Sequence, residues 1–337
     1  MSGIMMMVIA IVVLGGAYIF YGRYLEKKWG IDPNAKTPAY EMEDGVDYVP
    51  ADTNIVFGHQ FASIAGAGPI NGPIQAAIFG WLPVLLWILI GGVFFGAVQD
   101  FSAMYASVKN KGRSIGSIIE TYIGKTGKKL FLLFCWLFCI LVVAAFADVV
   151  AGTFNGFLTA DDGTVSKITA NGAVATTSMI FIVEAVCLGM ILRYGKLHKW
   201  VNTAIAIVML IGAVALGMNF PMFLPRTTWH VIIFIYILIA SVAPVWSLLQ
   251  PRDYLNSYLL IFMIIAAIIG VFVANPQCHL EAFTSFNVDG QTLFPILFVT
   301  IACGAVSGFH SLVSSGTASK QIKNEKNMLP VSFGAML

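Results

Sequence analysis

A break in an apolar segment constrains this chain more than any other feature. The stretch AGAGPINGP, Ala65 to Pro73, lies inside residues 57–80, which are long and apolar enough to cross a lipid bilayer. In a helix interior each glycine costs about 1 kcal/mol and each proline about 3 kcal/mol relative to alanine, so this run predicts an interrupted helix. Because unpaired backbone cannot face lipid, the break must be buried in protein or line a polar cavity. Interrupted helices of this kind form mid-membrane binding sites in secondary transporters.

The same residues have a second interpretation. Gly68 and Gly72 form a GxxxG pattern, which is typical of the close-packed face between two membrane helices. Pro69 and Pro73 disfavour a continuous packing helix, so the sequence favours the break.

The composition is that of a membrane protein. Hydrophobic residues make up 58% of the sequence and charged residues 11%, against about 25% charged residues in soluble domains. We therefore expect an all-α, polytopic transmembrane helical bundle. The five cysteines show no disulfide framework, and we find no metal motif, P-loop, nucleophile elbow or nucleic-acid-binding pattern. The sequence predicts no enzyme activity, no metal or cofactor and no nucleic-acid partner.

Repeated apolar runs predict about nine membrane spans. They cover residues 4–22, 57–80, 82–108, 128–152, 173–194, 199–219, 228–250, 254–274 and 293–317. Residues 109–127 are basic with scattered apolar positions, which predicts a cytoplasmic connection with an interfacial helix. If the loop after the first span is cytoplasmic, all 19 lysines and arginines except Lys167 and Arg226 lie on that side. This positive-inside bias predicts an N-terminus outside the cytoplasm.

The order of the irregular spans predicts an inverted repeat. An extra first helix and a cytoplasmic loop occupy 1–56, a first five-helix repeat 57–219, and a partial second repeat of three helices 220–337. The interrupted span opens the first repeat, and span 228–250, with Pro244 inside it, opens the second in the opposite orientation. Irregular helices in corresponding positions of two halves indicate a secondary transporter. A five-plus-five repeat needs two more helices, so we expect the second repeat to be incomplete and the chain to be truncated.

Four ionisable side chains inside the predicted spans are candidates for proton or ion coupling, because such groups are costly at membrane depth. They are Asp100, Asp148, Glu184 and His310. Both aspartates could instead reach the interface or cap packed helices, and a lone histidine is often structural. Glu184 is the most central, and desolvation there suits a group that gains and loses a proton during transport.

Hydroxyl side chains surround His310 in the last predicted span. Ser314 and Ser315 could hold a cation such as Na⁺ together with carbonyl groups freed at the break, although hydrogen bonding between helices is an equally good interpretation. His59 and Gln60, just before the break, could form an inner gate. Arg252 and Asp253 would form either a local ion pair or another part of the gate.

The break itself is the candidate substrate site. A carboxylate-bearing substrate would suit the exposed amide end of a half-helix beginning near Asn71. The region around Pro244 would face this end from the second repeat. The candidate substrate-binding residues are Ala65, Gly66, Ala67, Gly68, Pro69, Asn71, Ala243 and Pro244.

Several motifs together resemble the carbon starvation protein A (CstA) family of bacterial inner-membrane transporters. They are DGVDYVP, VFGHQFASIAGAGPINGP, GAVQDF, PRDYL and TIACGAVSGFHSLVSSGT, in this order along most of the chain. The resemblance implies a leucine-transporter-type fold and uptake of nutrients during carbon starvation, either of peptides or of pyruvate by proton symport. It also implies a longer chain, since the family continues past the point of Leu337. The family commonly has two histidines where this chain has His59 and Gln60, which puts a role needing both in doubt.

The sequence thus predicts a multi-pass symporter that moves a small nutrient across a bacterial inner membrane. A membrane-embedded nutrient sensor or a channel could use the same site. A membrane-embedded enzyme would need a nucleophile with its base, or metal ligands, at recognisable spacing, and we find neither. The choices between peptide and pyruvate and between H⁺ and Na⁺ stay open, as does the oligomeric state.

Overall fold

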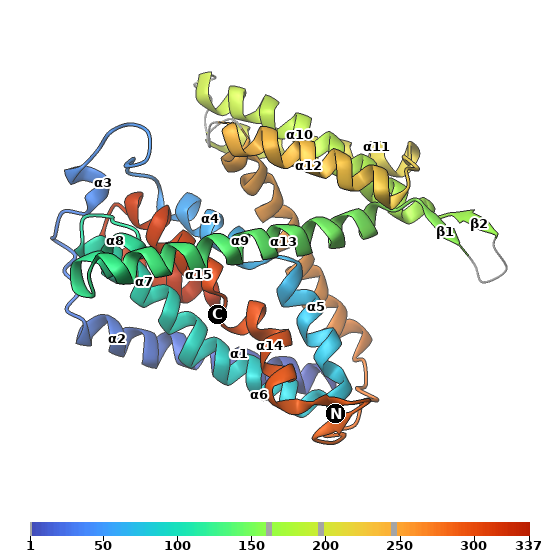
Figure 1. The fold of residues 1–337 in the computed structure, drawn as a ribbon, viewed down its shortest axis with the longest axis horizontal. Helices are drawn as coiled ribbons and strands as arrows, with labels where there is room; N and C mark the ends of the chain where they lie inside the picture. Colours follow the sequence, from blue (N-terminus) through green and yellow to red (C-terminus); the bar gives the residue numbers. More distant parts are fainter. Residues whose placement is uncertain (1, 160–163, 195–198, 244–247) are drawn as a thin grey trace. The chain divides into compact units, whose positions relative to one another are not determined.

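A computed structural model describes residues 2–159, 164–194, 199–243 and 248–337, and its backbone is almost entirely helical (Figure 1). The chain divides into two compact units. Unit 1 comprises Met1–Lys128 and Leu259–Leu337, and unit 2 comprises Lys129–Tyr258. Unit 1 contains the interrupted segment and most of the candidate site.

Unit 1 begins with a long peripheral helix. Gly3–Lys28 runs without a break through α1 (Gly3–Gly16), a π-helical turn η1 (Ala17–Gly22) and α2 (Arg23–Lys28), which confirms the first predicted span. The rest of the unit before α9 consists of α3 (Pro38–Glu41), α4 (Thr53–Ile64), α5 (Ala67–Ala76), η2 (Ala77–Phe79), α6 (Trp81–Gly91), the π-helical turn η3 (Gly92–Ala97), α7 (Val98–Lys109) and α8 (Ile115–Tyr122). Helix α8 lies where a short connecting helix was expected.

The predicted break is confirmed. Helix α4 ends at Ile64, Ala65 and Gly66 leave the helical conformation, and α5 begins at Ala67. The expectation that the second half-helix starts near Asn71 is wrong. Pro69 does not delay the start, because it occupies the first turn of α5, where backbone N–H groups have no partner within the helix. Pro73 lies inside α5.

The last predicted span, 293–317, contains a second break that the sequence analysis missed. Helix α14 (Leu293–Ala305) ends before Val306, and α15 (Gly308–Gly316) starts after Ser307. The Ser307 hydroxyl caps α15 by accepting a hydrogen bond from the Phe309 N–H at 3.3 Å. Short turns η4 (Ala318–Lys320), η5 (Glu325–Asn327) and η6 (Leu329–Gly334) follow.

The two interrupted helices pack against each other through glycines. A Cβ atom added to Gly68 would lie 2.5 Å from the Cys303 Sγ, and one added to Gly72 would lie 2.5 Å from the Thr300 carbonyl oxygen. A Cβ atom added to Gly304 on α14 would lie 3.0 Å from the Cα atom of Pro69. Only glycine permits such approaches, so the GxxxG interpretation and the broken-helix interpretation both hold for the same segment.

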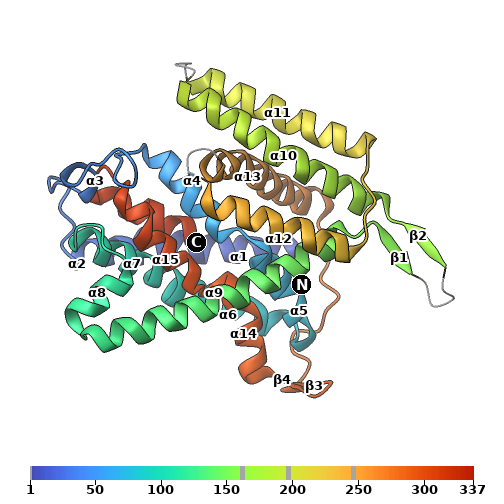
Figure 2. The ribbon, with the colours of Figure 1, turned by 45° about the horizontal axis from the view of Figure 1, so that its top comes forward.

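Unit 2 is built from long helices that are also apolar. They are α9 (Lys125–Phe154), which starts in unit 1, α10 (Thr169–Tyr194), α11 (Lys199–Asn219), α12 (Arg226–Val242) and α13 (Leu249–Ala274), which ends in unit 1. Helices α10 and α11 lie side by side in both views (Figure 1, Figure 2). The connections between α9 and α10 and between α13 and α14 each carry a small hairpin that was not expected. The first pairs β1 (Phe157–Thr159) with β2 (Val165–Lys167), and the second pairs β3 (Asn287–Val288) with β4 (Gln291–Thr292).

Seven helices in the described residues are long and apolar enough to cross a membrane, so nine spans are not confirmed. Two of the expected spans are not among these seven helices, for separate reasons. The interrupted segment is split into α4 and α5, and α12 has only 17 residues because it ends at Val242 instead of continuing to residue 250. The PRDY motif accordingly lies in the first turns of α13. Pro244 falls outside the described residues, and the inverted repeat with its boundaries stays a prediction.

The glycine contact generates a first prediction. Gly72→Ala should lower the melting temperature by a few degrees, because the added methyl group overlaps the Thr300 carbonyl and overpacking costs about 1–3 kcal/mol. The matched control is Gly212→Ala in α11, where an added Cβ meets no atom within 4 Å. Thermal unfolding of the purified protein in detergent measures both. A Gly72→Ala protein as stable as the Gly212→Ala protein would contradict the packing.

Candidate functional site

The most unusual group of side chains in unit 1 is a buried carboxyl beside a buried imidazole. Asp100 is on α7 and is 1% exposed, and His310 is on α15 and is 2% exposed. Their nearest atoms, Asp100 Oδ2 and His310 Nδ1, are 3.9 Å apart. This distance is too long for a hydrogen bond, yet close enough for strong electrostatic coupling at a buried position.

Three buried polar atoms of this pair have no hydrogen-bond partner among the described residues. Both carboxyl oxygens of Asp100 and the Nδ1 atom of His310 lack one in the described part of the chain. A buried charge without a partner is strongly destabilising, so the carboxyl must be compensated by a proton or by a neighbouring cation. Buried polar groups are nearly always satisfied in proteins, and the exceptions gather at functional sites.

Helix α4 brings a third buried polar side chain to the same place. Gln60 is fully buried, and its Nε2 donates a hydrogen bond to the His310 carbonyl oxygen at 3.3 Å. Its Oε1 atom has no partner among the described residues. Gln60 is five residues before the break at Ala65, so the polar cluster adjoins the end of α4. His59, the other gate candidate, is partly buried on the same helix.

Hydroxyl groups hold the helices of this cluster together. Ser314 donates to the Asp100 carbonyl oxygen at 2.9 Å, and Ser315 donates to the Ser311 carbonyl oxygen at 2.9 Å. The Gln99 amide donates to the Ser311 hydroxyl at 3.2 Å. The Ser314 hydroxyl therefore joins α15 to α7, as the helix-to-helix interpretation expects, whereas the Ser315 hydroxyl bonds within α15. The described residues contain no group of three or more histidine, cysteine, aspartate or glutamate side chains that could hold a metal ion.

At the break, Gly66 and the residues after it have different surroundings. An added Cβ on Gly66 would meet no atom within 4 Å, so open space adjoins it. Gly68 and Pro69 instead pack on α14, and Asn71 is exposed on α5. A separate cavity of about 350 Å³ lies at the far end of α5, where Gln75, Gln291 and Thr300 provide its polar lining. It is therefore not part of the break. Ala67 begins α5.

The remaining predicted residues lie in unit 2. Asp148 on α9 is half exposed, forms an ion pair with Arg226 Nη2 at 2.6 Å and shares a hydrogen bond with His230 Nε2 at 3.0 Å. Glu184 on α10 has one buried carboxyl oxygen, Oε2, without a hydrogen-bond partner in the described part of the chain. Arg252 lies 3.7 Å from Asp253 and donates a hydrogen bond to the Tyr236 hydroxyl. Ala243 follows the last residue of α12, while Pro244 lies outside the described residues, so their position opposite the break stays a prediction.

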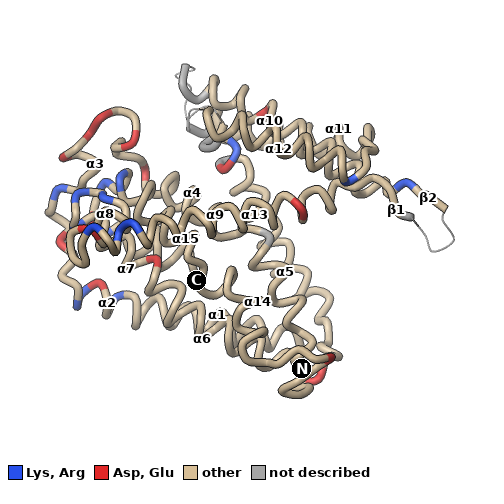
Figure 3. The backbone as a smooth tube through the Cα atoms, in the orientation of Figure 1, with Lys and Arg blue, Asp and Glu red and all other residues tan. Residues whose placement is uncertain are grey.

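Charged residues gather at one end of unit 1, around α2, α7 and α8 (Figure 3). Ion pairs tie this end together across distant parts of the sequence. Lys323 Nζ donates to Asp52 Oδ1 at 2.6 Å, and this hydrogen bond raises the pKa of Lys323. Lys128 donates in the same way to Glu120 and lowers the pKa of that carboxyl.

Sequence reasoning missed one buried ion pair at this end. Lys109, the last residue of α7, donates to both carboxyl oxygens of Glu325 at 2.8 Å, and Glu325 is 3% exposed. Glu325 also accepts a hydrogen bond from the Asp32 N–H at 3.0 Å. The pair joins α7, which carries Asp100, to the chain that follows α15. Nothing in the local pattern marks it, because its members are 216 residues apart.

The family is decided by comparison with known proteins. The family model described as "Carbon starvation protein CstA" matches residues 2–337. The chain belongs to the CstA family. It is 37% identical to the peptide transporter CstA of Escherichia coli K12 over 340 residues, which cover 95% of this chain and 46% of that protein.

Two further relatives differ in the transport that their names describe. The peptide transporter CstA of Bacillus subtilis 168 is 37% identical over 361 residues, covering 100% of this chain and 56% of that protein. The pyruvate/proton symporter BtsT of Escherichia coli K12 is 36% identical over 354 residues, covering 100% of this chain and 47% of that protein. The chain thus spans about half the length of the curated relatives it matches. These relatives are named as transporters and not as enzymes. No solved structure matches the chain.

The buried ion pair generates a second prediction. Glu325→Ala should lower the free energy of unfolding by about 1–3 kcal/mol, because it removes a buried acceptor from Lys109 and from the Asp32 N–H. Glu43→Ala, at an exposed position, is the control and should change stability little. Thermal unfolding in detergent tests both, and equal melting temperatures for the two variants would show that the pair contributes nothing.

Proposed function

We propose that this chain forms the transport site of a secondary active symporter that imports a small nutrient. The observation that carries the proposal is the buried Asp100–His310 pair, which lies between α7 and the second of two interrupted helices. Interrupted helices supply unpaired backbone groups for substrate, and an unsatisfied buried carboxyl supplies a place for a coupling ion. The activities for which the relatives are named, peptide transport and pyruvate/proton symport, agree with this function.

The coupling ion in this proposal is a proton bound to the Asp100–His310 pair. Asp100 accepts the proton when no neighbouring cation compensates the charge of its carboxylate. The His310 imidazole, 3.9 Å away, exchanges this proton with Asp100 after a small movement of α15. Gln60 links this movement to α4, since its amide already bonds the His310 backbone. A Na⁺ ion is the alternative coupling ion, because the Ser314 and Ser315 hydroxyls donate their protons to backbone carbonyls and keep oxygen lone pairs for a cation.

The substrate in this proposal binds at the break beside Gly66. The open space there and the first amides of α5 suit a carboxylate, which both pyruvate and peptides carry. Gly68 and Pro69 contribute indirectly, because their contacts with α14 hold α5 in place. Ala65 and Ala67 flank the site through their backbone, whereas the exposed Asn71 lies one turn further along α5.

The membrane in this proposal is the bacterial inner membrane, and transport serves nutrient uptake during carbon starvation. The gathering of lysines and arginines at the α2, α7 and α8 end of unit 1 supports a cytoplasmic position for that end. The first helix would then begin outside the cytoplasm.

Uptake into cells lacking their own carriers tests the function. Radiolabelled pyruvate and a radiolabelled dipeptide are supplied separately to cells expressing the protein, with and without a proton uncoupler. We expect one of the two to accumulate above its external concentration and the uncoupler to abolish the accumulation. Equilibration without accumulation would indicate a channel, and uptake of neither from protein present in the membrane would contradict the proposal.

Variants of the buried pair test its role in coupling. Asp100→Asn and His310→Gln should reduce gradient-driven accumulation by at least about tenfold, the loss expected for a proton-transfer group. Exchange of internal for external substrate should persist in Asp100→Asn, since exchange requires binding but no net proton movement. Glu184→Gln is the matched control, because Glu184 also has an unsatisfied buried oxygen but lies in unit 2.

The control also distinguishes the two candidate acids. Normal accumulation by Asp100→Asn together with loss in Glu184→Gln would move the coupling site to α10. Loss of exchange as well as accumulation in Asp100→Asn would mean that Asp100 serves substrate binding or folding and not coupling.

A further inference from the structure

The motif DGVDYVP, residues 44–50, lies outside the candidate site, in the connection between α3 and α4. The Asp44 carboxylate closes this connection into a compact loop. Its Oδ1 atom accepts hydrogen bonds from the N–H groups of Val46, Asp47 and Tyr48 at 2.8, 2.9 and 2.9 Å. The Asp44 N–H donates in turn to the Tyr48 carbonyl oxygen at 3.2 Å. These internal bonds fix the backbone that carries the Tyr48 side chain.

Tyr48 joins this loop to the continuations of two helices. Its hydroxyl donates to the Lys111 carbonyl oxygen at 3.2 Å and approaches the Gly112 carbonyl oxygen at 3.4 Å, in the turn that follows α7. A Cβ atom added to Gly112 would lie 2.7 Å from the Tyr48 ring, so the ring packs on this turn. The Lys320 ammonium, in the η4 turn that follows α15, lies 5.1 Å from the centroid of the same ring.

The rest of the loop also contacts the chain that follows α15. The Asp47 carboxylate forms an ion pair with Lys320 Nζ at 3.3 Å. The Ala51 N–H donates a hydrogen bond to the Gln321 carbonyl oxygen at 3.1 Å, and α4 begins two residues later. The loop therefore connects the ends of α4, α7 and α15, which are the three helices that supply the buried polar cluster.

Between this loop and the buried pair, α7 and α15 are in direct contact. The Ser107 hydroxyl on α7 donates to the Ser315 carbonyl oxygen at 2.7 Å and lies 2.8 Å from the Ser319 hydroxyl. All three serine side chains are fully buried. Ser107 follows Asp100 by seven residues, which is about 10 Å further along the helix toward the loop. Water from this end therefore reaches Asp100 and His310 only if α7 and α15 separate.

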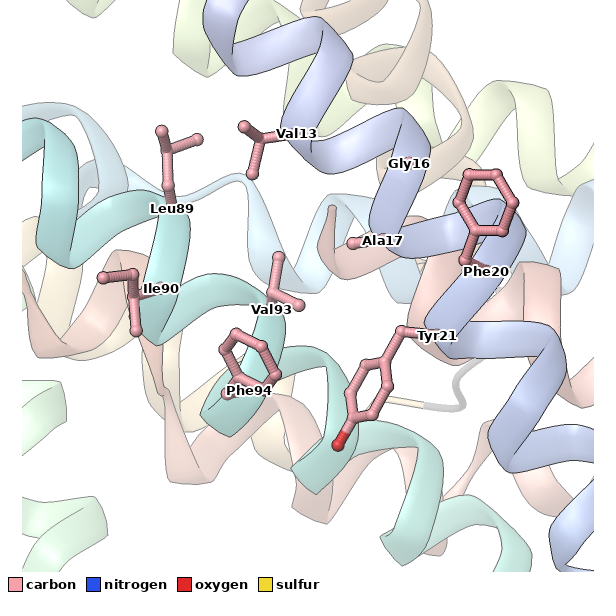
Figure 4. A pocket seen from close by; sticks show the side chains of 9 residues that line it. All are labelled: Val13, Gly16, Ala17, Phe20, Tyr21, Leu89, Ile90, Val93 and Phe94. Carbon is pink, nitrogen blue, oxygen red and sulfur yellow. The ribbon is translucent and has the colours of Figure 1, made fainter.

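The first helix holds α7 independently of the loop. Its Tyr21 ring is turned toward Phe94 in the apolar groove between the two helices, with ring centroids 5.3 Å apart (Figure 4). Trp29, directly after α2, stacks on Phe101 at 4.8 Å, and the Tyr105 hydroxyl donates to the Trp29 carbonyl oxygen at 2.7 Å. Helix α7 is thus fixed by the first helix, and α15 is the element that the loop holds against it.

We propose that Tyr48 is a positioning residue for transport, which holds the α15 side against α7 and thereby closes the cytoplasmic path to the Asp100–His310 pair. The proposal rests on the proposed function, which places the charged end of unit 1 in the cytoplasm. Release of the coupling ion into the cytoplasm then requires the Tyr48 contacts to break. Weakening these contacts shifts the population toward a state that is open to the cytoplasm.

Cysteine labelling of the full-length protein in membrane vesicles tests the proposal. The reporter is Ser315→Cys in a chain whose native cysteines are all replaced, because this position is fully buried between α7 and the pair. A membrane-impermeant thiol reagent is added to inside-out vesicles, where it reaches the cytoplasmic side. A second reporter, Gly66→Cys at the open break, is labelled in right-side-out vesicles.

Tyr48→Ala should speed cytoplasmic labelling of Ser315→Cys about tenfold, the change expected when a hydrogen bond and a cation–π contact are lost. Tyr48→Phe keeps the ring beneath Lys320 but loses the hydroxyl, so it should give a smaller increase. Labelling of Gly66→Cys from outside should not become faster in either variant, because opening the cytoplasmic path adds no access from outside. A protein that is merely destabilised would be labelled faster at both reporters.

Tyr122→Ala is the matched control, since it removes an exposed tyrosine from α8 at the same end of unit 1, and it should leave both labelling rates unchanged. Equal labelling of Ser315→Cys with and without Tyr48→Ala would overturn the proposal. An equal increase in Tyr122→Ala, or at Gly66→Cys, would overturn it as well. If Tyr48→Ala fails to fold, Lys320→Met removes the charge over the ring, and unchanged labelling in that variant would refute the role of Tyr48.

The labelling requires no transport, so this proposal and the proposed function fail separately. Normal substrate accumulation together with unchanged labelling in Tyr48→Ala would contradict the role of Tyr48 alone. Faster labelling in a protein that accumulates neither pyruvate nor the dipeptide would support the closure by Tyr48 and contradict the transport of these substrates.

Discussion

The close contact between α5 and α14 is the interaction on which the rest of unit 1 depends. Helix α5 begins at one break and α14 ends at the other, and at membrane depth the unpaired backbone at each break must be covered by protein or line a polar space. Gly68 and Gly72 permit that cover, because without side chains they let the backbone of α5 lie directly on Cys303 and Thr300. The contact holds the two breaks near each other. On the other side of the breaks, α4 and α15 meet α7, and polar side chains of these three helices form the buried cluster.

The sequence predicted the first break and the glycine contact from the same nine residues, but as alternatives. They are compatible because the break falls at Ala65–Gly66, before both prolines, which leaves Gly68 and Gly72 inside a helix. The second break was missed because Val306–Ser307 contains no proline and interrupts a continuous apolar run. The signal available was Ser307, a favoured N-cap residue, followed directly by a glycine.

The candidate site was predicted as separate residues and not as an arrangement. Asp100, His310 and Gln60 were each identified, since ionisable or amide groups inside apolar spans are unusual. Their meeting depends on contacts over 210 to 250 residues of sequence, as between Gln60 and His310 or Ser314 and Asp100, which no local pattern encodes. Glu184 seemed the strongest candidate because it is central in its span. Asp100 is distinguished by its burial beside His310, a second buried side chain with an unpartnered atom among the described residues. The sequence does not reveal this arrangement.

Labelling of Gly66→Cys tests most directly whether the break is the transport site. The variant is made in a chain whose five native cysteines are replaced, and it is exposed to a water-soluble thiol reagent with and without pyruvate or the dipeptide. The open space at Gly66 predicts labelling, and the transported substrate should slow it while the other compound does not. Gly212→Cys, on the apolar helix α11, should remain unlabelled. Absence of labelling at Gly66→Cys, or labelling that the transported substrate does not slow, would contradict the account.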